Sequence, residues 1–185
     1  LTWSPDSRQI AFVSGIMSDE GNIAGEVYIV PAAGGEARCI TSGIDHSMTW
    51  IEWRKEGIIY GGRLIESCVI GSIDPATGKT HLIFHGLYAI NGQGPQSIHI
   101  AKDGRFAVLR QSFTEPPTIY TSSLHSNEWE ALISSEIDVE TFPPLHVENR
   151  HWHNADGTPV QGFLVYPPDY KPGERRPMFV HVHGG

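Results

Sequence analysis

Cysteine is scarce in this chain. Only Cys39 and Cys68 occur among its 185 residues, and they do not form a CxxC pair. The sequence therefore gives no indication of a structural zinc site. A disulfide between the two cysteines stays open, but we favour two buried free thiols, because cysteine packs as a small hydrophobe.

Basic side chains are also few, with 13 lysines and arginines against 21 aspartates and glutamates, for a net charge of −8. A nucleic-acid partner is not expected, because phosphate binding needs a basic surface. No apolar run approaches the roughly 18 residues that span a bilayer, so no membrane partner is expected either. The chain starts at Leu1 rather than methionine, which makes the missing signal peptide uninformative. The compartment stays undetermined, with a cytoplasmic location slightly favoured over a periplasmic or secreted one.

Amphipathic helix patterns are essentially missing from residues 1–145. Val, Ile, Tyr, Phe and Trp instead cluster in runs of four to six residues, separated by Gly, Pro, Asn and Asp. Such runs suit half-buried strands joined by turns. The sequence therefore predicts a mainly β protein, long enough to bury roughly 70% of the surface that its unfolded chain exposes.

An internal repeat of 48 residues organises these strands. Aligning Ile10, Ile58 and Phe106 gives the same spacing twice (58 − 10 and 106 − 58). The segments around these residues share an apolar start, a polar turn and a short β-rich run: 3–14, 50–61 and 98–109. Each unit then continues with two further strand-like runs on either side of a polar turn. Four short strands per repeat of this length are typical of a β-propeller blade.

We therefore predict three four-stranded blades forming a partial propeller, over residues 1–46, 47–94 and 95–145. A β-sandwich with accidental periodicity is the alternative. Propellers need about four to eight blades to close, and a repeat buries its face only against neighbours. We accordingly expect this chain to be part of a longer one, with the remainder of its own chain as a partner.

The sequence changes character after residue 134. A polar and then proline-rich stretch, 136–144, is typical of a domain connection. Two strand-like stretches follow, Leu145–Trp152 and Val160–Tyr166, around the turn Asn154–Pro159. A third predicted strand, Met178–Val182, leads into His183-Gly184-Gly185. We assign residues 146–185 to the start of a second domain.

The two terminal glycines are the candidate chemical feature. Glycines after a buried strand leave the backbone N–H groups free to face a developing negative charge, and one such donor stabilises acyl transfer by about 3 to 4 kcal/mol. An HGG loop after the third strand provides half of the oxyanion hole in α/β-hydrolases. On this pattern Gly184 and Gly185 present oxyanion-hole backbone, and His183 shapes the loop.

In this order of parts the chain resembles the prolyl oligopeptidase family, most closely its acylaminoacyl-peptidase and dipeptidyl-aminopeptidase-like branch. The resemblance covers the whole chain, and it is specific over the last forty or so residues. Five features carry it: WSPDS at 3–7, TEPPTIY at 114–120, DGTPVQGFLVYPPDY at 156–170, RPM at 176–178 and HGG at 183–185.

The resemblance implies a β-propeller followed by the first strands of an α/β-hydrolase domain. It also implies a serine peptidase that hydrolyses short peptides through a Ser-Asp-His triad, without a metal or organic cofactor. No G-x-S-x-G motif occurs in the chain. We therefore expect the triad to lie outside these residues and the chain by itself to be inactive, because an oxyanion donor without a nucleophile cannot form an acyl-enzyme. The choice among endo-, dipeptidyl- and acylaminoacyl-peptidase activity stays open, as does the oligomeric state.

Metal-binding and ligand-binding roles for single histidines and tryptophans are less well supported than structural roles. The pairs His151/His153 and His181/His183 each share a strand face, but neither has a third ligand nearby, so ordinary strand histidines are favoured over a metal site. The five tryptophans are expected in packing positions rather than on a ligand platform: Trp3, Trp50, Trp53, Trp129 and Trp152.

Three charged residues could lie at the inner mouth of the propeller and bind a substrate terminus: Arg63, Glu66 and Glu115. Solvated turn charges are the favoured reading of all three. The runner-up function is a non-catalytic β-propeller that binds protein or peptide partners, and an esterase is a third possibility. The propeller reading does not account for a second domain that enters HGG, and ordinary esterases lack a propeller.

Overall fold

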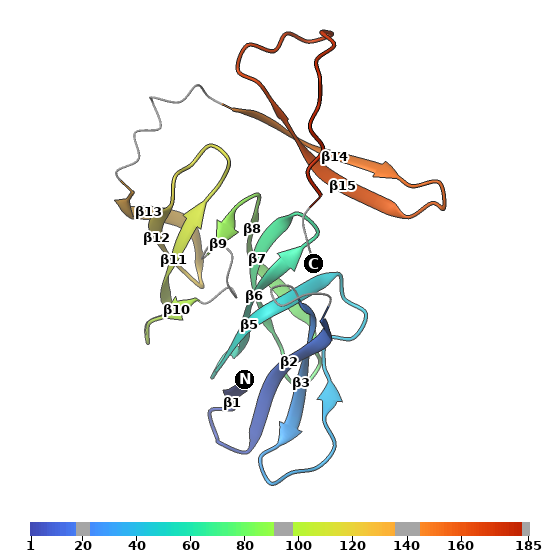
Figure 1. Ribbon diagram of the computed structural model, residues 1–185. Coiled ribbons are helices and arrows are strands. Elements are labelled where there is room, and N and C mark those ends of the chain that lie inside the picture. The colour runs from blue at the N-terminus through green and yellow to red at the C-terminus, as the bar shows by residue number, and fades with distance from the viewer. Residues whose placement is uncertain (18–22, 91–97, 136–144, 183–185) are drawn as a thin grey trace.

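The computed structural model describes residues 1–17, 23–90, 98–135 and 145–182. Strands are the only regular elements in these ranges, which confirms the predicted mainly β class. They form three successive antiparallel sheets and a separate two-stranded hairpin (Figure 1). The predicted connection at residues 136–144 lies outside the described residues.

The first sheet has the strand order β1-β2-β3-β4, and the second has the order β5-β6-β7-β8. Each strand therefore pairs with its neighbour in sequence, as polar turns between short apolar runs favour. The strands of the first sheet are β1 (Thr2–Trp3), β2 (Gln9–Met17), β3 (Ile23–Pro31) and β4 (Arg38–Cys39). Those of the second are β5 (His46–Arg54), β6 (Gly57–Leu64), β7 (Ser67–Ile73) and β8 (Thr80–Gly86).

The third sheet has five strands rather than four. Its path is β10-β11-β12-β13, and β9 pairs with the far end of β11. β9 and β10 lie along the same side of β11, one at each end, because β12 occupies the other side. The strands are β9 (Ala89–Ile90), β10 (His99–Ile100), β11 (Arg105–Gln111), β12 (Thr118–Ser123) and β13 (Ser126–Ser134).

The 48-residue spacing marks equivalent positions. Ile10 lies in β2, Ile58 in β6 and Phe106 in β11, and each pairs with a residue of the strand that precedes it. Trp3 and Trp53 are the partners in the first two sheets, and Ile100 is the partner in the third. The repeat predicted from the sequence is therefore a repeat of strand pairing.

The hairpin joins β14 (His146–His153) and β15 (Pro159–Tyr166) through eight paired positions. Both strands and their turn were predicted from the sequence. In the turn, Gly157 has a φ of 82° and its N–H donates to the Asn154 carbonyl oxygen, at 2.9 Å between nitrogen and oxygen. Because only glycine adopts such a φ without a steric cost, this residue sets the register of the hairpin.

The prediction of a third strand in the second domain, at Met178–Val182, is wrong for the described residues. Met178–Val182 has no regular structure there, and its apolar side chains are exposed, Phe179 completely. A strand exists through hydrogen bonds to a neighbouring strand, and within the described chain these residues belong to no sheet. Apolar character and β propensity alone therefore do not make it a strand.

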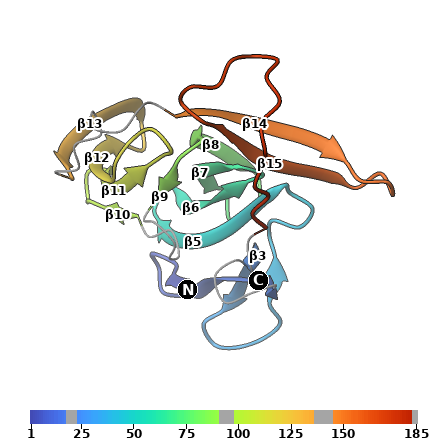
Figure 2. The same ribbon diagram turned by 45° about the horizontal axis from the view of Figure 1, so that its top comes forward.

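Two hydrophobic cores lie on opposite faces of the second sheet. Ile58 and Tyr60 of β6 pack toward the first sheet, whereas Ile59 between them packs toward the third. In β7, Val69 and Ile70 alternate in the same way. Successive side chains of a strand point to opposite faces, so both strands are almost continuously apolar, as a doubly covered sheet requires. Figure 2 shows the second sheet between the other two.

The cysteine and tryptophan expectations are confirmed only in part. Both cysteines are free, but Cys39 is half-buried and only Cys68 is buried. Trp50, Trp53 and Trp129 pack against the two cores. Trp3 and Trp152 are instead about half exposed, because each lies on an outer strand with a face that no described element covers.

A half-buried histidine beside the first core gives the fold a pH dependence. The Tyr60 hydroxyl lies 2.8 Å from His46 Nδ1, and burial lowers the pKa of His46 below its usual value. As the pH falls below about 6.5, the unfolded chain takes up this proton before the folded chain does, so stability is lost on acidification. We expect a lower Tm at pH 5.5 than at pH 7.5, and a smaller difference in His46→Gln. Equal differences in both proteins would contradict this assignment.

Candidate functional site

The residues first predicted to carry chemistry are not described. His183, Gly184 and Gly185 lie outside the described residues, so their oxyanion-hole role stays a prediction. The candidate site that the structure does describe involves two of the three charged residues singled out at the propeller mouth, Arg63 and Glu66.

These two residues line a cavity of about 370 Å³ where the second and third sheets meet the hairpin. This volume is in the range of small-molecule sites. Larger hollows among the described residues each lie along a single sheet. The lining residues that matter here are Arg63 of β6, Glu66 of the β6–β7 turn, Cys68 of β7, Tyr88 before β9, Phe113 after β11 and Phe163 of β15.

The hairpin presents one of its two faces to this cavity. Directly paired residues of antiparallel strands share a face, so Phe163 lies on the same face as Asn149. His151 is two residues from Asn149 and shares that face too. The opposite face carries Glu148, whose carboxylate accepts a hydrogen bond from the Tyr166 hydroxyl and pairs with Arg150.

An aromatic pair joins the hairpin to the third sheet, and an ionisable pair joins it to the second. The rings of Phe113 and Phe163 meet edge to face with their centroids 5.3 Å apart. Nε2 of His151 lies 3.7 Å from Oε1 of Glu66. An aromatic pair and an ionisable pair therefore lie at the same cavity.

Glu66 is held in this cavity by a strained turn. Leu64 pairs with Ser67, so Ile65 and Glu66 form a two-residue hairpin turn. Ile65 has a φ of 54°, which is sterically costly for a β-branched side chain. Strain of this kind persists where the surrounding structure fixes it, and it is common at functional sites.

The Glu66 carboxylate has an uncompensated oxygen. Its side chain is 19% exposed, and its buried Oε2 has no hydrogen-bond partner among the described residues. A buried acceptor without a partner costs about 1 to 3 kcal/mol. Glu66 also lines the cavity, so a cationic donor there would meet an anionic acceptor, with the rings of Phe113 and Phe163 beside its hydrocarbon part.

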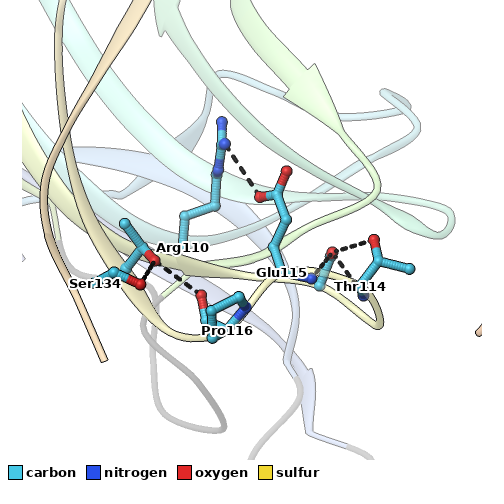
Figure 3. A network of polar contacts seen from close by, with 7 residues as sticks. Arg110, Thr114, Glu115, Pro116 and Ser134 are labelled. Atoms are coloured by element: carbon cyan, nitrogen blue, oxygen red, sulfur yellow. Dashed lines mark hydrogen bonds and ion pairs between the residues drawn. The ribbon is translucent and has the colours of Figure 1, made fainter. Parts of the chain in front are cut away.

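Glu115 does not face this cavity as a free carboxylate. Its Oε2 lies 3.2 Å from the buried side chain of Arg110 (Figure 3). The Ser112 hydroxyl accepts the N–H groups of Thr114 and Glu115 and so holds the turn that presents the carboxylate. The favoured reading of Glu115 as a solvated turn charge holds only in part: it lies in a turn and its side chain is 36% exposed, but it pairs with a buried cation.

Arg110 is the residue that sequence reasoning missed. Its guanidinium carbon lies 3.7 Å from the ring centroid of Tyr120, 4.2 Å from that of Tyr88 and 5.5 Å from that of Trp129. Arginine packs over aromatic faces in this way because its planar cation is weakly hydrated. The arrangement fixes Tyr88, which also lines the cavity. The signal in the sequence was an arginine directly after the apolar run Phe106–Leu109.

Cys68 also lines the cavity but is not a nucleophile. Burial raises the pKa of its thiol to about 11, so the reactive thiolate is scarce at neutral pH.

The described residues contain no group of three histidine, cysteine, aspartate or glutamate side chains that could hold a metal ion. Nor do these ranges include a helix that could cross a membrane.

Serially paired sheets followed by a hairpin and a cavity between them define an all-β chain built from repeats. No protein-family model matches it. Over 186 aligned residues it is 20% identical to Dipeptidyl-peptidase 5 of Porphyromonas gingivalis, covering 99% of this chain and 26% of that protein.

Two solved structures share the fold. The isopeptidase AtxE2 superposes with a TM-score of 0.69 and 20% identity, covering 94% of this chain and 26% of the other. A structure from an analysis of two prolyl endopeptidases superposes with a TM-score of 0.51 and 18% identity, covering 88% and 25%. The chain thus spans about a quarter of the length of these relatives. The comparisons confirm the resemblance to prolyl oligopeptidase-family peptidases that the sequence motifs indicate.

Proposed function

We propose that this chain is part of a serine peptidase that hydrolyses short peptides, with acylaminoacyl- or dipeptidyl-peptidase-like activity. The observation that carries the proposal is the similarity to Dipeptidyl-peptidase 5 along 99% of the chain. The motifs from Asp156 to Tyr170 and the HGG sequence support the serine-type chemistry. No metal or organic cofactor enters the proposed reaction.

In this proposal residues 1–145 are propeller blades and residues 146–185 begin the α/β-hydrolase domain. The serial order of four strands in each of the first two sheets supports the blades, because a propeller blade is a four-stranded sheet of this kind. The nucleophile, acid and base lie outside the chain, so the chain alone is inactive. Gly184 and Gly185 supply oxyanion-hole backbone, and His183 shapes that loop.

The cavity has a place in the same function. We assign it to the amino-terminal end of the peptide substrate, whose ammonium group would donate hydrogen bonds to Glu66. Phe113 and Phe163 would cover the first side chain of the peptide. An ammonium is favoured because Glu66 is an anionic acceptor that lines the cavity, and a cationic donor gives the stronger hydrogen bond.

Labelling with a fluorophosphonate tests the proposed activity. In the longer protein that contains this chain, we expect covalent labelling of a serine outside these 185 residues. The isolated 185-residue chain, run alongside, should stay unlabelled because it lacks a nucleophile elbow. Absence of any labelled serine in the longer protein would favour the non-catalytic propeller, and partner binding would then be the question.

A further inference from the structure

His151 and Glu66 form a contact that changes with pH. An imidazole gains its positive charge between about pH 8 and pH 5, and histidine is the side chain whose charge ordinarily changes there. At 3.7 Å from Oε1 of Glu66, a protonated His151 is an ion-pair partner of the carboxylate, whereas a neutral His151 is not. Glu66 is also the residue to which the ammonium of a ligand is assigned above.

We propose that protonated His151 competes with the ammonium of a ligand for Glu66, so that acidification weakens binding in the cavity. The proposal rests on the ammonium site under "Proposed function". His151 is part of the hairpin, and Glu66 lies in the turn between two strands of the second sheet. At low pH their ion pair therefore also holds the hairpin more firmly to this sheet.

The other charged groups around this contact do not produce the same effect. Arg63 lines the cavity from β6. An arginine stays charged throughout this pH range, so its effect on the ligand is the same at low and at high pH. Cys68 stays protonated because burial raises the pKa of its thiol to about 11. On the hairpin, Glu148 and Arg150 lie on the face that points away. His153 shares the face of His151 and is the matched control.

Binding of 2-phenylethylamine to the 185-residue chain measures the competition. This amine keeps its charge between pH 5.5 and pH 8, because alkyl amines titrate near pH 10. We expect binding about three- to fivefold weaker at pH 5.5 than at pH 8, the range that a partly exposed ion pair gives. In His151→Gln the difference should fall below about twofold, and in His153→Gln it should stay as in the wild type. Glu66→Gln should bind weakly at both pH values.

A ligand-free double-mutant cycle separates the two proposals. The Tm changes of Glu66→Gln and His151→Gln should be non-additive by about 1 to 3 °C at pH 5.5 and additive at pH 8. Binding at pH 8 with an unchanged pH dependence in His151→Gln would overturn the competition alone. Coupling in the cycle without amine binding at pH 8 would overturn the ammonium site, and the competition with it.

Discussion

Arg110→Met is expected to lower the free energy of unfolding by about 3 kcal/mol, because it removes cation–π contacts, worth up to about 2 kcal/mol each when desolvated, and the partly exposed ion pair with Glu115. The Arg110 side chain is 9% exposed and that of Glu115 36%. The cation–π contacts that the variant loses are those of the guanidinium with Tyr88, Tyr120 and Trp129. Urea unfolding, with the slope of the transition compared between proteins, measures the change.

Two further variants separate charge from shape at this position. Arg110→Lys keeps the charge but loses the planar group, so we expect a loss of about 1 to 2 kcal/mol. Glu115→Gln removes only the partly exposed partner and should cost about 1 kcal/mol or less. If Arg110→Met and Glu115→Gln destabilised equally, the ion pair rather than the aromatic contacts would dominate.

Gly71→Ala is the second substitution with a large expected effect, about 3 kcal/mol of destabilisation, because added atoms in a packed core force costly shifts. Gly71 of β7 pairs directly with Tyr60 of β6. A methyl group at Gly71 would lie 2.5 Å from Cζ and from the hydroxyl oxygen of Tyr60. Tyr60 has no exposed surface, and its hydroxyl is hydrogen-bonded to Nδ1 of His46, so its ring has no room to move. Thermal unfolding measures the loss.

Removing the ring should remove the conflict. In a Tyr60→Leu background, Gly71→Ala should cost less than about 1 kcal/mol, which gives a coupling of about 2 kcal/mol. Gly162→Ala is the matched control in a strand. Its added methyl would lie 3.2 Å from the ring of Trp152, which is half exposed and can shift, so we expect a change within about 0.5 kcal/mol. Equal costs of Gly71→Ala in both backgrounds would exclude the clash with Tyr60.

Local patterns predict most of the strands because their causes are local. The Asp74–Lys79 turn is an example: the Asp74 carboxylate accepts the N–H groups of Ala76 and Thr77, and these bonds lower the pKa of the carboxyl. Gly78 has a φ of 74°, which glycine adopts freely. A turn of this kind, between apolar runs, specifies β7 and β8 without reference to the rest of the chain.

The sequence by itself therefore determined the β class, the 48-residue repeat of strand pairing and the terminal hairpin, since alternation of apolar side chains and turn chemistry act over a few residues. Tertiary structure alone decided the candidate cavity. Glu66, Phe113 and His151 are far apart along the chain and meet only when the second sheet, the third sheet and the hairpin pack together. The tertiary structure also left Met178–Val182 without strand structure. A strand needs a neighbouring strand to accept and donate its backbone hydrogen bonds, and apolar character does not supply that neighbour.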